Sequence, residues 1–209
     1  AASDVYKRQL ELWHGPTSAF KDMALQCLPH FFSASAEKLR EEGTLDHEFM
    51  ILVATSGDTG KAALEGFKGV DGVSIGVLFP DGGVSDIQRK QMVTTTGDNV
   101  QVWAVRGNFD DCQTGVKRTF ADEKFTEKLL NEYRIALSSA NSINWGRLLP
   151  QVVYYISSYA ELVAAGKIEA GCPIDVCVPT GNFGNILAAW YAKQIGVPIE
   201  RLLCASNDN

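Results

Sequence analysis

Three segments of the 209-residue chain combine residue types that bind anions or react with carbonyl compounds. Residues 55–60 (TSGDTG) and 179–185 (PTGNFGN) are rich in glycine, hydroxyl and amide groups. Lys21 lies beside Phe20, shortly after a Gly-Pro turn and at the expected start of a helix. The positive end of a helix destabilises the lysine charge, and the neutral amine can form a Schiff base with an aldehyde. The sequence therefore offers two candidate anion-binding loops and one candidate nucleophile.

Each glycine-rich loop follows a short apolar run, residues 49–54 or 174–178, and precedes a segment of helical length. Such loops, at the carboxyl ends of strands and the N-termini of helices, commonly bind anions in α/β sheets. A turn that needs glycine only for its backbone angles is the alternative for either loop alone. Neither loop has the spacing of a P-loop or of GxGxxG. A cofactor phosphate or an anionic substrate is therefore a better match than a nucleoside triphosphate.

Further apolar runs at residues 73–79, 100–105 and 201–205 alternate with helix-length segments. Runs of this length bounded by turn residues are typical of strands buried on both faces. Helices are expected at residues 19–42 (kinked or divided at Pro29), 59–68, 85–95, 109–128, 145–165 and 184–195. The packed face of helix 145–165 should carry Trp145, Tyr154, Tyr155 and Tyr159. The alternation predicts an α/β fold with open, mainly parallel sheets flanked by helices.

The composition is that of a soluble globular protein, with 45% hydrophobic and 21% charged residues and a net charge of −6. No uncharged apolar run approaches the roughly 18 residues of a membrane helix, and no block of like charges suggests a nucleic-acid surface. Five cysteines without CxxC spacing, and no signal peptide, predict free thiols in a reducing cytoplasm. Cys172 and Cys177 are expected to be buried thiols, and no metal site is expected.

The two ends of the sequence suggest a fragment. Residues 4–9 match the translation of a transposon-end sequencing adapter, so we expect residues 1–9 to be a non-native leader and the natural sequence to begin near Leu10. At the other end, the apolar run 201–205 is typical of a core strand, and the sequence ends only four residues after it. We therefore expect truncation at both ends.

Four motifs closely resemble those of the threonine synthase family, and they occur in the family's order. They are WHGPTSAFKD at residues 13–22, ATSGDTG at 54–60, SANSINWGRLL at 139–149 and PTGNFGN at 179–185. The resemblance extends over residues 10–209. It implies a tryptophan-synthase-β-like enzyme of fold type II with the cofactor pyridoxal 5′-phosphate (PLP). The implied reaction converts O-phospho-L-homoserine and water to L-threonine and phosphate, with no nucleic-acid or membrane partner.

Carried over position by position, the resemblance implies that Lys21 binds PLP covalently and then serves as the catalytic base. The loop that would hold the cofactor phosphate consists of Gly181, Asn182, Phe183, Gly184 and Asn185. Asp58 stands near the cofactor ring, where many relatives of the class have Asn. Its role stays open, because a carboxylate donates a hydrogen bond only when it is protonated.

The resemblance also implies a substrate-binding set. Its members are Ser56, Gly57, Thr59 and Gly60, together with Asn141 and Arg147 for the substrate phosphate. The planar fork of Arg147 suits that phosphate. Without the resemblance, residues 141–147 read as a helix-capping turn followed by an exposed arginine. His14 orients the lysine turn or lines the site, or it only satisfies a buried turn.

The resemblance places residues 45–140 in a smaller subdomain, and residues 10–44 with 141–209 in a larger cofactor domain. It places the hydroxyl partner of the pyridine nitrogen beyond Asn209, so the isolated fragment is expected to be inactive.

Whether the enzyme is a monomer or a homodimer stays open. Two other functions remain alternatives: a threonine-synthase-like PLP phospho-lyase that eliminates phosphate, and a non-catalytic ligand-binding domain on the same fold.

Overall fold

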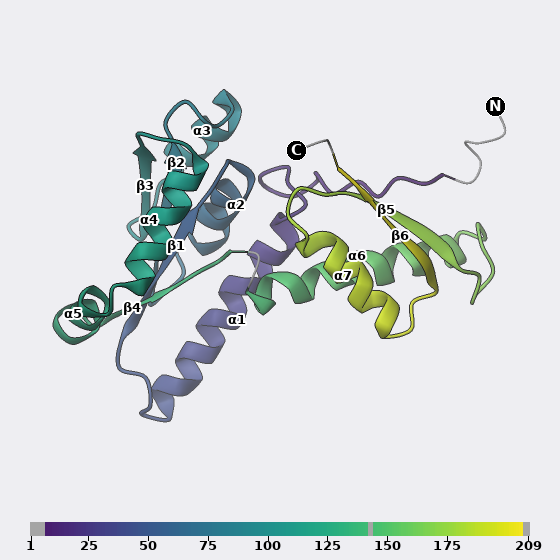
Figure 1. Cartoon of the computed structure of the whole chain (residues 1–209). Helices are drawn as coiled ribbons and strands as arrows, with labels where there is room; N and C mark the ends of the chain where they lie inside the picture. The colour runs from purple at the N-terminus through teal and green to yellow at the C-terminus, as the bar shows by residue number, and fades with distance from the viewer. Residues whose placement is uncertain (1–6, 142–143, 207–209) are drawn as a thin grey trace.

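The computed structural model describes residues 7–141 and 144–206, which form two parallel sheets with helices between and around them (Figure 1). Residues 1–6 of the expected leader lie outside the described residues. The elements in chain order are α1 (Asp22–Glu41), β1 (Glu48–Ala54), α2 (Asp58–Phe67), β2 (Val73–Pro80), α3 (Asp86–Val93), β3 (Val100–Val105), α4 (Phe109–Ala121), α5 (Glu123–Tyr133), β4 (Ile135–Ser138), α6 (Trp145–Ala164), β5 (Ile174–Pro179), α7 (Gly184–Gln194) and β6 (Ile199–Ala205). None of the helices in this described part has the length and hydropathy of a membrane span.

The four-stranded sheet has the strand order β3-β2-β1-β4, and all its pairings are parallel. Its central strand β1 is apolar on both sides. Ile51 and Val53 belong to the core shared with α1 and α2, whereas Leu52 and Ala54 pack beneath α4 on the opposite face. This alternation explains the unbroken apolar run in the sequence. The predicted α/β fold with a parallel sheet between helices is confirmed.

The second sheet contains β5 and β6, which also pair in parallel. Val178 and Ile199 pack with residues of α6 and α7, but alternate positions of β5 and most positions of β6 are exposed, as Leu203 is to 45%. The prediction that these runs are buried on both faces is wrong for the described residues. Here the helices α6 and α7 supply the core on one face of the sheet only.

Helix α1 lies between the two sheets and packs against both α2 and α6 (Figure 1). It runs through Pro29 as one helix, so of the two expected outcomes there, a kink or a division, the division is wrong. Because proline has no N–H, the carbonyl of Leu25 receives no helical hydrogen bond from position 29. That carbonyl faces Gly66 of α2, where an added Cβ would lie 2.0 Å from the Leu25 oxygen. The absence of a side chain at Gly66 therefore sets how closely α1 and α2 approach.

The segment predicted as one helix over residues 109–128 forms two helices, and the short strand β4 after them was missed. Asp122 separates α4 from α5, and its carboxylate accepts a hydrogen bond from the Phe125 N–H at 3.0 Å. An aspartate in this position is a strong helix N-cap. Arg134 then ends α5 in the left-handed conformation, with φ of 57°, and turns the chain into β4.

Two glycine-to-alanine substitutions test the close approach of α1 and α2. Gly66→Ala should lower the free energy of unfolding by about 1–3 kcal/mol, because its methyl group collides with the backbone of Leu25. Gly115→Ala, in α4, is the matched control, since nothing lies within 4 Å of its added Cβ. It should raise the same free energy by roughly 0.5–1 kcal/mol through helix propensity. Denaturant unfolding measures both values, and equal effects would contradict the packing described here.

Candidate active site

Lys21 is held by a tightly bonded loop at the N-terminus of α1. The structure makes Lys21 the N-cap residue, because α1 begins at Asp22 and not at residue 19 as the sequence suggested. The carboxylate of Asp22, only 3% exposed, accepts hydrogen bonds from the N–H groups of Thr17 at 2.9 Å and Ala19 at 3.2 Å, and from the Thr17 hydroxyl. An added Cβ on Gly15 would lie 2.5 Å from that carboxylate. The Gly-Pro turn thus wraps around Asp22 and fixes the backbone beside Lys21.

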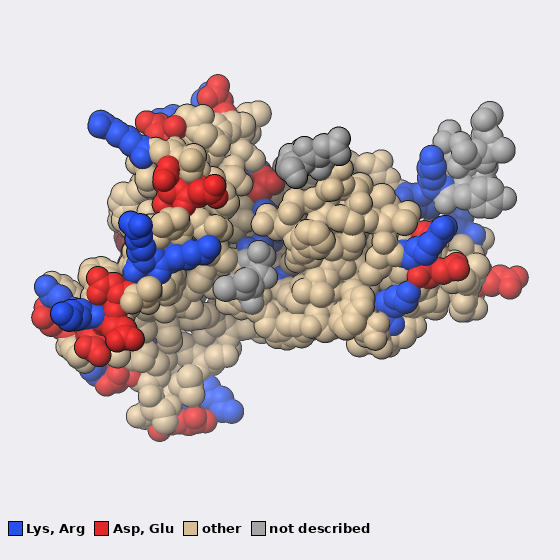
Figure 2. All heavy atoms as spheres, viewed as in Figure 1, with Lys and Arg blue, Asp and Glu red and all other residues tan. Residues whose placement is uncertain are grey.

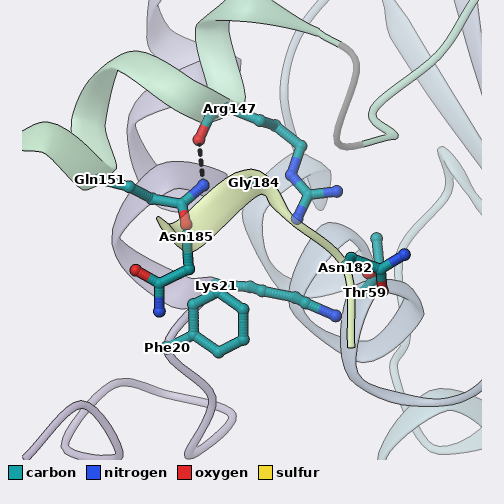
Figure 3. Close-up of a pocket in the computed structure, with 8 residues that line it drawn as sticks. All are labelled: Phe20, Lys21, Thr59, Arg147, Gln151, Asn182, Gly184 and Asn185. Atoms are coloured by element: carbon teal, nitrogen blue, oxygen red, sulfur yellow. Dashed lines mark hydrogen bonds between the residues drawn. The ribbon is translucent and has the colours of Figure 1, made fainter. Parts of the chain in front are cut away.

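The pocket beside Lys21 is formed by residues from four elements and their preceding loops (Figure 3). Its lining residues are Phe20, Lys21, Thr59, Arg147, Gln151, Asn182, Gly184 and Asn185. Six of these are residues expected in the site from the sequence. The lining does not include the other expected residues, which are Ser56, Gly57, Asp58, Gly60, Asn141, Gly181 and Phe183.

Three helices begin at this pocket: α1 at Lys21, α2 just before Thr59, and α7 at Gly184. Neither α1 nor α7 has a side-chain cap, and in α2 the Thr55 hydroxyl accepts the N–H of Gly60 in the first turn. By contrast, α3, α4, α5 and α6 each begin with a side chain that caps a backbone N–H. The first N–H groups of a helix have no partner within the helix, and they attract anions. The uncapped ends therefore point to a ligand with more than one anionic group.

The loop after β1 is stabilised from within and by α3. The hydroxyl of Thr55 accepts hydrogen bonds from the N–H groups of Gly57 and Gly60, both at 2.9 Å. Gly57 has a φ of 133°, which favours glycine. The Asp58 carboxylate accepts a hydrogen bond from the Gln88 amide at 2.7 Å. From this loop and the start of α2, Thr59 is the residue that lines the pocket.

The loop after β5 leads directly into the N-terminus of α7, as the sequence predicted. Asn182, Gly184 and Asn185 line the pocket, whereas Phe183 is 66% exposed. Asn185 is fixed by the Tyr155 hydroxyl, which donates either to its side-chain oxygen or to its backbone oxygen, the latter at 3.1 Å. The sheet and α6 thus hold the glycine-rich loop at the pocket.

Arg147 is buried, with 2% of its surface exposed, so the alternative of an exposed arginine after a capping turn is wrong. One guanidinium nitrogen donates to the Ala140 carbonyl at 2.9 Å. Gln151 donates from its amide to the Arg147 carbonyl at 2.6 Å. The Arg147 Nε and the Gln151 Oε1 are both buried, with no hydrogen-bond partner in the described structure. Unpartnered buried polar atoms are unfavourable, so these two atoms mark a position for a polar ligand.

The amine of Lys21 is poised to lose its proton near neutral pH. Burial lowers the pKa of Lys21 from 10.5 to about 8. The carboxylate of Asp58 opposes this effect, while the charges of Arg147 and Lys61 add to it. Burial also lowers the pKa of Arg147 to about 10. A substantial fraction of Lys21 is therefore uncharged at mildly alkaline pH and can act as a nucleophile.

Sequence reasoning missed Gln151 and the roles of two tyrosines. Gln151 follows Arg147 by four residues and therefore shares its helix face, a spacing that could have revealed it. Tyr154 and Tyr155 are buried as expected, but their hydroxyls also bind the site, because Tyr154 donates to the Phe20 carbonyl and Tyr155 to Asn185. Trp145 is 51% exposed and does not belong to the core.

His14 and the cysteines lie outside the pocket. His14 is exposed and pairs with Glu11 at 2.8 Å, so it neither lines the pocket nor satisfies a buried turn. All five cysteines are free thiols, but Cys172 and Cys177 are exposed, contrary to the expectation of burial. No group of His, Cys, Asp and Glu within residues 7–141 and 144–206 is arranged to bind a metal.

No protein-family model matches the chain. Individual relatives do match over nearly all of it. "Threonine synthase-like 1" of Homo sapiens is 51% identical over 205 residues, which are 96% of this chain and 27% of that protein. Threonine synthase of Schizosaccharomyces pombe is 46% identical over 203 residues, again 96% of this chain and 38% of that protein. The chain thus spans between about a quarter and two fifths of these relatives' lengths.

The solved structures give the same result. The PLP-bound threonine synthase from Brucella melitensis matches with a TM-score of 0.79 and 45% identity, over 95% of this chain and 39% of that one. Threonine synthase from yeast also matches with a TM-score of 0.79, at 41% identity. By sequence and by fold, this chain is similar to one part of the threonine synthases and threonine synthase-like proteins.

Proposed function

We propose that this chain is the part of a PLP-dependent threonine synthase that carries its reactive lysine and its phosphate-binding loops. The enzyme would convert O-phospho-L-homoserine and water to L-threonine and phosphate. The observation that supports this most is the convergence of the Lys21 amine, the uncapped end of α7 and the buried Arg147 on one pocket. The relatives and the solved PLP-bound neighbour support the same assignment.

The residues of the pocket fit PLP. The cofactor carries an aldehyde for the Lys21 amine and a phosphate for the uncapped N–H groups of α7. The residues from Gly181 to Asn185 would hold the phosphate, as the sequence suggested. When bound, the cofactor supplies an electron-withdrawing ring that stabilises negative charge at the substrate's α-carbon.

The reaction needs a group that moves protons, and Lys21 is placed to be that group. With PLP and substrate bound, a free Lys21 amine would accept the proton from the substrate's α-carbon. A pKa of about 8 suits both removal and return of a proton near neutral pH. The nearby ring of Phe20, 5.5 Å from the Lys21 nitrogen, limits where the amine can move.

The substrate phosphate requires a cation and hydrogen-bond donors at the other side of the pocket. Arg147 offers an unpartnered buried Nε–H for this purpose, and Thr59 a hydroxyl. The Gln151 oxygen is an acceptor, because its amide nitrogen is bound to the Arg147 carbonyl. A substrate with a phosphate and an ammonium group offers partners for both unpartnered atoms. Ser56, Gly57, Gly60 and Asn141 would act by shaping the loops around it.

The same proposal includes a cytoplasmic location and a small-molecule partner. Acidic and basic side chains intermingle over α3, α4 and α5 and at the opposite end of the molecule, and Figure 2 shows no extended basic surface on this face. Such a surface offers nothing that matches the negative charge of nucleic acid.

The proposal also includes the division of the chain into a smaller subdomain at residues 45–140 and a larger one. The two separate sheets support this division.

The covalent role of Lys21 is tested by Lys21→Ala in the full-length protein. Without the amine no covalent bond to the cofactor forms, so turnover should fall below detection and borohydride should fix no cofactor to the protein. Lys68→Ala, on the exposed end of α2, is the control and should retain both properties. Full activity of the Lys21 variant, or continued trapping at the pocket, would refute the assignment.

The pKa of Lys21 predicts how cofactor binding depends on pH. Only the neutral amine attacks the aldehyde, so apoprotein should bind PLP covalently about ten times faster at pH 9 than at pH 7. The rate should level off once the pH exceeds the Lys21 pKa of about 8. Stopped-flow absorbance of the bound cofactor measures this profile. A rate that keeps rising to pH 10 and beyond would mean that Lys21 has an ordinary lysine pKa.

The identity of the product separates replacement from elimination. Relatives named threonine synthase and relatives named threonine synthase-like both match, so phosphate elimination is the second candidate function. The full-length protein should convert O-phospho-L-homoserine to L-threonine and phosphate in equal amounts. Chromatography of amino acids with a coupled assay for 2-ketobutyrate measures the ratio. Ketobutyrate without threonine would identify a phospho-lyase, and no reaction with the cofactor would favour a ligand-binding domain.

A further inference from the structure

Lys61 is a buried cation close to the site that the proposed reaction does not use. It lies in α2, and its side chain is only 8% exposed. Its ammonium group forms an ion pair with Asp58, three residues earlier, at 3.7 Å. Lys61 also lines a cavity together with Pro16 and Thr17, which belong to the loop that leads to Lys21. A buried lysine is rare unless its charge is paired, so its position needs an explanation.

Asp58 connects Lys61 to the rest of the loop after β1. The carboxylate receives the Gln88 amide from α3 at 2.7 Å and the Lys61 ammonium from α2 at 3.7 Å, both at Oδ1. The Gln88 side chain occupies the space where a Cβ on Gly57 would lie, 2.3 Å from the nearest atom. Asp58, Lys61 and Gln88 therefore form a three-residue clamp that holds the loop against α3, one residue before Thr59.

We propose that Lys61 is a positioning residue, whose buried ammonium pairs with Asp58, holds the loop after β1, and offsets the negative charge of Asp58 beside the Lys21 amine. This gives Asp58, whose role the sequence left open, a place in the clamp. The inference concerns the site of the proposed function and rests on Lys21 being its reactive amine.

The electrostatic environment of Lys21 agrees with this geometry. The charged groups that affect it are Asp58 and Lys61 from α2 and Arg147 from α6. Asp58 raises the pKa of Lys21, whereas Lys61 and Arg147 lower it. The loop before α7 contributes Asn182, which is uncharged, to the same pocket. Loss of Lys61 removes one cation and leaves the carboxylate unpaired, and both changes favour the charged form of Lys21.

The test measures the pKa of Lys21 in full-length apoprotein. Acetic anhydride acetylates neutral amines, and mass spectrometry of the Lys21 peptide gives the rate at each pH. Lys61→Met should raise the pKa of Lys21 by about 0.5 to 1 and slow its acetylation at pH 7 about three- to ten-fold. Lys68→Met is the matched control at the exposed end of α2 and should leave the pKa unchanged.

Two further variants separate charge from structure. Lys61→Arg keeps the cation and should leave the pKa of Lys21 near that of the wild type. Asp58→Asn, added to Lys61→Met, removes the unpaired carboxylate and should return the pKa towards the wild-type value. If Lys61→Met does not fold, Lys61→Gln decides the question, because it removes the charge but keeps a hydrogen-bond donor.

An unchanged pKa of Lys21 in the folded Lys61→Met or Lys61→Gln variant would overturn the inference. So would a shift that persists after Asp58→Asn, since the effect would then not involve the carboxylate. The wild-type apoprotein is tested separately for covalent PLP binding. Failure there refutes the proposed function, whereas normal PLP binding with an unchanged pKa in the variants refutes only the role of Lys61.

Discussion

The site depends on one buried carboxylate, that of Asp22. It accepts two backbone N–H groups and a hydroxyl from the preceding turn, and it sits in the first turn of α1. Because a buried charge is stable only when it is bonded on several sides, the turn has little freedom to rearrange. Lys21 is the residue next to it. The backbone position of Lys21 is therefore set by hydrogen bonds that do not include its amine.

The position of α1 extends this constraint to the whole molecule. The helix packs on α2, which covers the four-stranded sheet, and on α6, which covers the two-stranded sheet. Lys21 thus lies where residues of both parts meet, with Thr59 from one and Arg147 from the other in the same pocket. Burial of the amine at this junction lowers the pKa of Lys21. The packing that joins the two sheets therefore also lowers the pKa of Lys21.

Much of this arrangement could be predicted from the sequence, because local signals agreed with the fold. The apolar run of β1 and its glycine-rich loop gave a strand, a turn and a helix in the right places. The features that could not be predicted depend on contacts between residues far apart in the sequence. The exposure of Cys177 reflects which face of β5 the helices cover, and β4 is too short to stand out beside α5. The clamp on Asp58 requires Gln88, thirty residues away, and no periodicity along the chain points to that pairing.

The two uncapped helices, α1 and α7, affect the stability of the protein. A side-chain cap stabilises a helix by about 1 kcal/mol, and both helices lack one at the same pocket. An anion bound there would restore what those helices lack, and any ligand that binds only the folded state shifts the folding equilibrium towards it. Newly made protein without ligand would therefore be less stable towards unfolding than protein that has bound its phosphate-bearing ligand. The supply of that ligand would help to set how much of the protein persists.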